Sequence, residues 1–139
     1  MSFIRVYIHF VWSTKNREPF LETKTLRNKL WFHIKENAIE NDIVIDHIGG
    51  YKDHCHCLVS MGWKFSISQI MKMIKGESSK WINDNGLIES TFSWQNEYYA
   101  VGVSNKELDK TRAYIRNQEE HHKSVGFDEE IKRFKKFYD

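Results

Sequence analysis

The segment from Tyr51 to Met61, YKDHCHCLVSM, limits the possible folds more than any other part of the sequence. Successive side chains of a β-strand point to opposite faces of the sheet. His54 and His56 would therefore share one face, and the two cysteines would share the other face with the aliphatic residues that follow. The pattern predicts a strand that presents two imidazoles on an open face and packs its other face into an apolar core.

The histidine pair has three interpretations. A tetrahedral zinc site made of both histidines and both cysteines is excluded, because ligands on opposite faces of one strand cannot converge on one ion. Two ordinary surface histidines are compatible with the pattern, since the chain contains seven histidines. The third interpretation is half of a metal site, in which two neutral imidazoles need oxygen ligands from elsewhere in the chain and from a substrate. Cys55 and Cys57 fit buried, reduced thiols of a cytosolic protein.

The remaining elements follow from hydrophobic periodicity and from start and stop signals. We expect Gly49-Gly50 to end the second strand, Ser66 or Ser68 to cap the second helix, and Ser104 to Glu107 to form a capping box. In chain order the expected elements are a strand at 3–12, a helix at 25–41, strands at 43–48 and 54–61, a helix at 67–82, a strand at 94–103 and a helix at 106–123.

This order predicts an α+β fold, a ferredoxin-like split βαβ plan with an antiparallel sheet, helices on one face and an additional helix toward the C-terminus. The other face would be free to meet a ligand or a second copy. With 139 residues, one domain is expected. We place it at residues 1–127, followed by a basic amphipathic tail at 128–139 that docks on the same domain.

The charge and the hydropathy limit which partners and which cellular compartment the sequence predicts. A formal net charge of +2 is too small to indicate nucleic-acid binding by itself, so any basic surface has to be local. The apolar N-terminus is short and contains Arg5 and His9, which argues against a signal peptide or a membrane span. We therefore expect a cytoplasmic protein with no membrane partner.

The helix expected at 106–123 contains AYIRNQEEHH. Tyr114 and Gln118 are four residues apart and share one helical face, whereas Leu108 and Ile115 point toward the core. Tyr114 would then be exposed. Each of the two polar residues could be an ordinary surface residue, but their combination with the histidine pair favours a functional role.

Taken together, the N-terminal strand, DHCHCLVSM, SISQIMKMIKGESSKWI and YIRNQ resemble the single-tyrosine HUH transposases, which include small insertion-sequence transposases and REP-associated tyrosine transposases. Cys55 stands where this family usually has a bulky hydrophobic residue. The resemblance implies that His54, His56 and Gln118 bind a divalent ion and that Tyr114 is the nucleophile.

The chemistry suits these residue types. A tyrosine has an ordinary pKa of about 10, so its attack on a phosphodiester needs a cation that makes the phosphate electrophilic and stabilises the leaving oxygen. Two imidazoles and an amide oxygen can hold Mg²⁺ or Mn²⁺ with positions left for the phosphate. The implied product is a 5′-phosphotyrosine and a free 3′-hydroxyl, from which the strands can be rejoined.

The resemblance also implies partners. These are single-stranded DNA with hairpins, and a second copy in a homodimer whose tyrosine helices could complete each other's sites. Basic and aromatic residues could contact the DNA, namely Arg5, Tyr7, Lys15, Arg17, Lys72 and Lys75, with His9 beside them on the first strand.

Several alternatives remain open. Tyr98 and Tyr99 rival Tyr114 as nucleophile, although neither is followed by a paired glutamine. The fold could also serve a ferredoxin-like module that binds single-stranded nucleic acid without chemistry. A domesticated relative that processes REP sequences would look the same in sequence. A two-histidine phosphoesterase is disfavoured, since no second histidine motif of the required kind is present.

Overall fold

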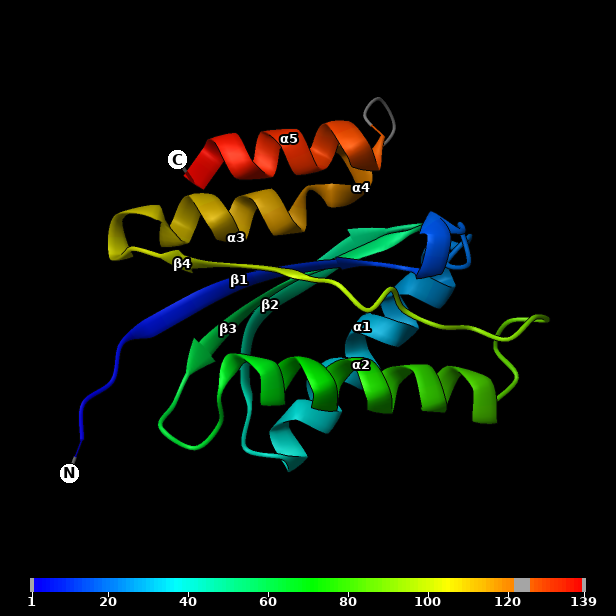
Figure 1. Cartoon of the computed structure of the whole chain (residues 1–139), viewed down its shortest axis with the longest axis horizontal. Coiled ribbons are helices and arrows are strands. Elements are labelled where there is room, and N and C mark those ends of the chain that lie inside the picture. Colours follow the sequence, from blue (N-terminus) through cyan, green and yellow to red (C-terminus); the bar gives the residue numbers. More distant parts are fainter. Residues whose placement is uncertain (1, 122–125, 139) are drawn as a thin grey trace.

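A computed structural model describes residues 2–121 and 126–138 of the chain. Its centre is a four-stranded antiparallel sheet with the strand order β2-β3-β1-β4, shown in Figure 1. The strands are β1 (Val6–Ser13), β2 (Val44–Tyr51), β3 (His54–Met61) and β4 (Tyr99–Val103). With one helix after β1 and one after β3, this order is the ferredoxin-like plan, so the predicted fold class is confirmed.

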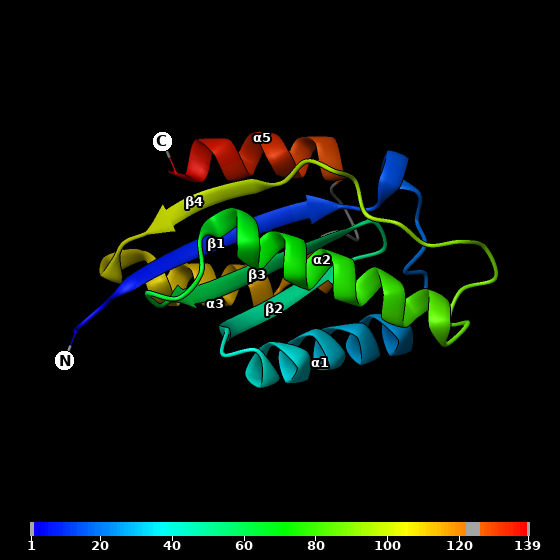
Figure 2. The same ribbon diagram turned by 60° about the horizontal axis from the view of Figure 1, so that its bottom comes forward.

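Two long helices, α1 (Lys24–Glu40) and α2 (Ile67–Asp84), cover one face of the sheet, as Figure 2 shows. The Thr23 hydroxyl accepts a hydrogen bond from the backbone N–H of Leu26 and caps α1. Ser66 caps α2 in a capping box with Gln69. None of the helices in the described parts of the chain is long and apolar enough to cross a membrane.

The main core lies between this pair of helices and the sheet. It includes the β1 residues Ile8, Phe10 and Trp12 and both cysteines of β3, all of them buried. Burial raises the pKa of the Cys55 and Cys57 thiols, so both stay protonated and act as small apolar side chains. The predicted core-facing side of β3 is therefore confirmed.

The opposite face of the sheet was expected to be open, and this expectation is wrong. Three helices cover it, α3 (Leu108–Arg116), α4 (Gln118–His121) and α5 (Phe127–Tyr138), as Figure 1 shows. The physical reason is that this face also carries apolar residues. Leu58 forms a second cluster with Val103, Leu108 and Ile115. Val11 forms a third with Ile131 and Phe134 of α5.

Gly49 and Gly50 do not end β2, contrary to expectation. The strand runs on to Tyr51 and pairs with β3 as far as His54. A Cβ atom on Gly50 would lie 2.2 Å from the carbonyl oxygen of His54, and one on Gly49 would lie 2.7 Å from the carbonyl oxygen of Ile115. The glycines are needed because neighbouring backbone comes too close for any side chain.

We expect Gly50→Ala to lower the free energy of unfolding by about 3 kcal/mol, because the added methyl group meets rigid backbone. Gly62→Ala is the matched control, since a Cβ there has nothing within 4 Å. Urea denaturation followed by circular dichroism measures both effects. Equal stability of the two variants would contradict the close approach.

Two further elements differ from the expectation. The last strand begins at Tyr99 rather than at residue 94, and Trp94 makes only an isolated bridge with Thr14. The expected single helix at 106–123 is a 3-10 turn, η2 (Asn105–Glu107), followed by α3, a break at Asn117 and α4. Ser104 makes no side-chain capping bond to this turn. The predicted end of the helix, Lys123, lies outside the described residues.

Candidate active site

The two histidines of β3 share one face, as predicted, but they are not on an open surface. His54 and His56 are both fully buried, with their ring centroids 5.2 Å apart. The covering helices α4 and α5 lie over this face of the strand. Because neither imidazole has exposed surface, the alternative that they are ordinary surface histidines is wrong.

His54 is held between a carboxylate and an amide. Its Nδ1 lies 2.8 Å from Oδ1 of Asp53, and its Nε2 lies 3.2 Å from Oε1 of Gln118. The carboxylate can only accept, so the Nδ1–H of His54 donates to it. Phe127, at the N-terminal end of α5, packs over His54, and the centroids of the two rings are 4.8 Å apart.

His56 has a neighbour at each ring nitrogen. Its Nδ1 lies 2.9 Å from Nε2 of His9, and its Nε2 lies 3.0 Å from Oε1 of Glu130. His9 was expected on an exposed polar face of the first strand, which is wrong, since only 1% of its surface is accessible. Burial first, and the neighbouring His56 second, lower the pKa of His9 well below its ordinary value, so His9 is neutral at pH 7.

Tyr114 lies beside this pair in the same chain. Its ring centroid is 5.5 Å from that of His56, and its hydroxyl donates a hydrogen bond to Oε1 of Glu130. The side chain is half-buried rather than exposed. Gln118 follows at the start of α4, and its Nε2 donates to the carbonyl oxygen of Tyr114 at 3.2 Å and to Glu130 at 3.3 Å. The four residues expected to act together are therefore close neighbours.

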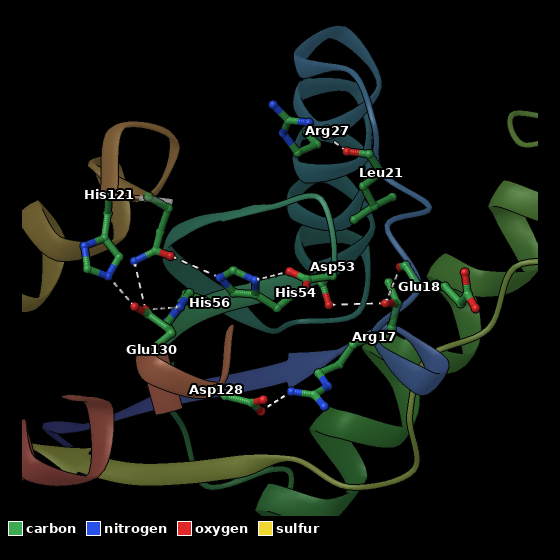
Figure 3. A network of polar contacts seen from close by, with 12 residues as sticks. Arg17, Glu18, Leu21, Arg27, Asp53, His54, His56, His121, Asp128 and Glu130 are labelled. Atoms are coloured by element: carbon green, nitrogen blue, oxygen red, sulfur yellow. Dashed lines mark hydrogen bonds and ion pairs between the residues drawn. The ribbon is translucent and has the colours of Figure 1, made fainter. Parts of the chain in front are cut away.

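Glu130 is the residue that the sequence reasoning missed. It is fully buried, and Figure 3 shows its carboxylate between His56 and His121. A signal was present in the sequence. Glu130 falls on the same face of α5 as Phe127, Ile131 and Phe134, at the i, i+3, i+4, i+7 spacing of an apolar stripe. A carboxylate in such a stripe is buried and needs a polar partner, which marks it as a candidate functional residue.

Three side chains could hold a metal ion. One ligand atom each of His54, His56 and Glu130 lie within 4.8 Å of one another. The environment of His54 suits such an ion, because Nε2 of His54 and the amide oxygen of Gln118 lie 3.2 Å apart and both are atoms that can serve as metal ligands. Asp53 supplies the outer carboxylate that commonly orients a metal-binding histidine.

Ion pairs fix the helices that carry these residues. Arg112 of α3 donates from Nε and Nη2 to the two oxygens of Asp46, each at 2.8 Å, and this contact holds the pKa of that carboxyl below its usual range. Arg27 of α1 forms a similar fork with Glu119, again at 2.8 Å, and also donates to the carbonyl oxygen of Leu21. Arg27 and Leu21 are visible in Figure 3. Residues on both sides of Tyr114 and Gln118 are thereby tied to the body of the chain.

The predicted DNA-contacting residues fall into separate places. Lys15 and Arg17 lie exposed in the turn η1 (Lys15–Arg17), close to the histidines, because the backbone N–H of Thr14 donates to the carbonyl oxygen of Asp53. Arg17 also pairs with Asp128 of α5 (Figure 3). A cavity of about 500 Å³ opens beside this turn, between the segment before β4 and α5.

The other four predicted contacts are farther from the histidines or engaged elsewhere. Arg5 is exposed and precedes β1, and Tyr7 is half-buried against the cluster around Leu58. Lys72 and Lys75 lie on α2, which covers the opposite face of the sheet. The Lys75 ammonium donates to two backbone carbonyl oxygens of residues 95 and 96, and partial burial lowers its pKa.

Comparison with known proteins places this arrangement in a family. The model of the IS200-like transposases matches residues 2–118. The chain belongs to this family. IS200-like transposases are DNA-cleaving enzymes, so transposition and DNA binding are the activities to which the site is related. The matched region includes both histidines, Tyr114 and Gln118, whereas Glu130 and α5 lie beyond it.

Solved structures agree on the fold. A candidate transposase from Deinococcus radiodurans R1 is similar with a TM-score of 0.67 and 20% identity, over 84% of this chain and 93% of that one. A REP-associated tyrosine transposase bound to a REP hairpin is similar with a TM-score of 0.64 and 19% identity, over 90% of this chain and 73% of the other. No curated protein matches the sequence.

Proposed function

We propose that this transposase cleaves and rejoins single-stranded DNA at hairpin-marked ends through a 5′-phosphotyrosine formed on Tyr114. The observation that carries the proposal is the meeting of four side chains in one chain. The hydroxyl of Tyr114, the amide of Gln118 and the imidazole of His56 all contact the buried carboxylate of Glu130. A nucleophile is thus next to residues that suit a divalent cation.

The ion would be held by His54, His56 and Glu130, with the amide oxygen of Gln118 as a further ligand. Imidazole, carboxylate and amide ligands without a thiolate suit Mg²⁺ or Mn²⁺, and both cysteines point to the other face of the sheet. When bound, the ion would polarise the scissile phosphate and stabilise the departing oxygen. Gln118 was the expected third ligand, and Glu130 extends that set.

The residues of the chain then have defined tasks. Tyr114 Oη forms a bond to phosphorus while the bond from phosphorus to the 3′-oxygen breaks. The phenolic proton passes to Glu130, which already accepts its hydrogen bond, and the 3′-oxygen gains a proton from solvent. The products are a 5′-phosphotyrosine and a 3′-hydroxyl. In the reverse step a 3′-hydroxyl attacks the phosphotyrosine, so the strands can be rejoined without an external energy source.

The DNA has to reach residues that are now covered. The side chains of His54 and His56 are fully buried beneath α4 and α5, and Glu130 of α5 is buried with them, so entry of a phosphate requires a shift of α5 that keeps Glu130 beside Tyr114 and His56. Lys15 and Arg17 are suited to meet the incoming backbone, since they are exposed beside Asp53 and His54. A shift of the N-terminal end of α5 would break the ion pair between Arg17 and Asp128 and free this arginine.

The hairpin as ligand is suggested by the similar transposase solved with a REP hairpin. A homodimer remains part of the proposal, and the arrangement favours a site built within each chain over one completed by the partner's tyrosine helix. Tyr114 and both histidines come together within one chain, which supports catalysis by each chain on its own. An active mobile element and a domesticated REP-processing relative would share this chemistry.

The test is incubation of the protein with single-stranded DNA that carries a terminal hairpin, in Mn²⁺, in Mg²⁺ or in EDTA. We expect a protein–DNA adduct that survives denaturing electrophoresis with either ion and is absent in EDTA, with the modified tyrosine identified by mass spectrometry. The fully double-stranded form of the same sequence is the control. Binding of hairpins without any adduct would contradict the proposal and favour the non-catalytic binding module.

A further inference from the structure

Glu130 uses its two carboxylate oxygens differently. Oε1 faces the metal-binding side, where it accepts from the Tyr114 hydroxyl and lies 3.0 Å from His56. Oε2 faces the other way and pairs with Nε2 of His121, at the end of α4. The orientation of the carboxylate therefore decides which oxygen the nucleophile meets.

His121 is well placed to control this orientation. Its ring centroid lies 5.8 Å from that of Tyr114, so the imidazole borders both the nucleophile and the carboxylate that binds it. It reaches Glu130 from α4, whereas Glu130 belongs to α5, and the contact joins the two helices across the site (Figure 3). Only 20% of the His121 side chain is exposed, so solvent competes weakly for this contact.

We propose that His121 is a positioning residue of the strand-transfer reaction. By donating to Oε2 of Glu130, it directs Oε1 to the Tyr114 hydroxyl, so that the phenolic oxygen is held in one place with its proton already facing an acceptor. His121 is outside the group of three residues whose ligand atoms come together, so it acts through Glu130. This inference rests on the proposed function, since it assigns a role within the same site.

A purely structural role would be redundant for α4. The partly buried fork between Arg27 and Glu119 already ties this helix to α1 with two bonds of 2.8 Å. The contact of His121 joins α4 to α5 rather than to α1, and its partner is the carboxylate at the centre of the site. The outer partners of functional groups act by orientation, and their loss typically costs about 10-fold to 100-fold in activity or affinity.

The test compares His121→Ala, His121→Gln and the control His33→Ala. His33 also pairs with a carboxylate, Glu77 at 2.6 Å, but on the far side of the sheet between α1 and α2. We expect His121→Ala to slow adduct formation at saturating DNA by about 10-fold to 100-fold with an unchanged Kd for the hairpin. The glutamine side chain can still donate from a similar position, so His121→Gln should recover most of the rate.

Other outcomes would overturn the inference. These are a full rate in His121→Ala, an equal loss in His33→Ala, or a loss that appears only in the Kd for DNA. A second measurement does not depend on activity. With 3-fluorotyrosine at position 114, the ¹⁹F signal of the free protein should move in His121→Ala and stay in place in His33→Ala. Absence of any adduct in the wild type would refute the proposed function, whereas an unmoved fluorine signal would refute the role of His121.

Discussion

Tyr114→Phe is expected to abolish the covalent protein–DNA adduct, with a fall in the rate of at least about 10³-fold, because no other group replaces a missing nucleophile. The substitution removes one oxygen atom and leaves the ring packed beside His56. Binding of the hairpin should persist. Denaturing electrophoresis of labelled DNA measures the adduct, and fluorescence anisotropy measures the binding.

Tyr98→Phe and Tyr99→Phe are the matched controls. The ring of Tyr98 packs against Phe10 in the main core, and that of Tyr99 packs against Phe134. Neither is expected to change the amount of adduct. An adduct that persists in Tyr114→Phe and disappears in one of the controls would move the nucleophile to β4 or the segment before it.

His56→Ala is expected to weaken Mn²⁺ binding at least about 100-fold and to remove the adduct even in excess metal, since a ligand is lost rather than an outer partner. The variant also leaves the carboxylate of Glu130 without its contact at 3.0 Å. Titration of Mn²⁺ followed by electron paramagnetic resonance measures the affinity directly. EDTA treatment of the wild type should produce the same loss of adduct, and added Mn²⁺ should reverse it.

His47→Ala controls for the general effect of removing a histidine from the sheet. His47 lies on β2, where it contacts Asp46 and Arg116 away from Glu130. The His47→Ala variant should bind Mn²⁺ with the affinity of the wild type. Equal affinities in His47→Ala and His56→Ala would show that the ion binds elsewhere.

The sequence was sufficient to predict the arrangement of the sheet and the two faces of β3. A period of two assigns His54 and Cys55 to opposite faces without further information, and the order of elements then selects the ferredoxin-like plan. The sequence did not predict that the second face of the sheet is covered, because this depends on how the C-terminal helices α3, α4 and α5 pack back onto it. The polar residues of β1 looked suitable for solvent, yet His9 is buried by α5.

Only part of the candidate site could be predicted, because the rest also depends on how distant segments pack. Tyr114 and Gln118 were recognisable by their spacing and by resemblance, and their contact with the histidines remained a matter of tertiary structure. Glu130 was overlooked because the C-terminal segment was interpreted by its basic charge and its apolar spacing. Glu130 itself carried the information, since burying a carboxylate in an apolar stripe is costly unless it is paired.

The site is assembled from β1, β3, α3, α4 and α5, so its parts are spread from residue 9 to residue 130 of the chain. During synthesis, a growing polypeptide that has already formed the sheet still lacks the acidic group. Contacts over such long sequence separations carry a large cost of loop closure and slow folding. A chain synthesised only as far as α4 would thus carry both imidazoles and the phenol without the carboxylate that joins them, so the proposed activity is expected to require α5.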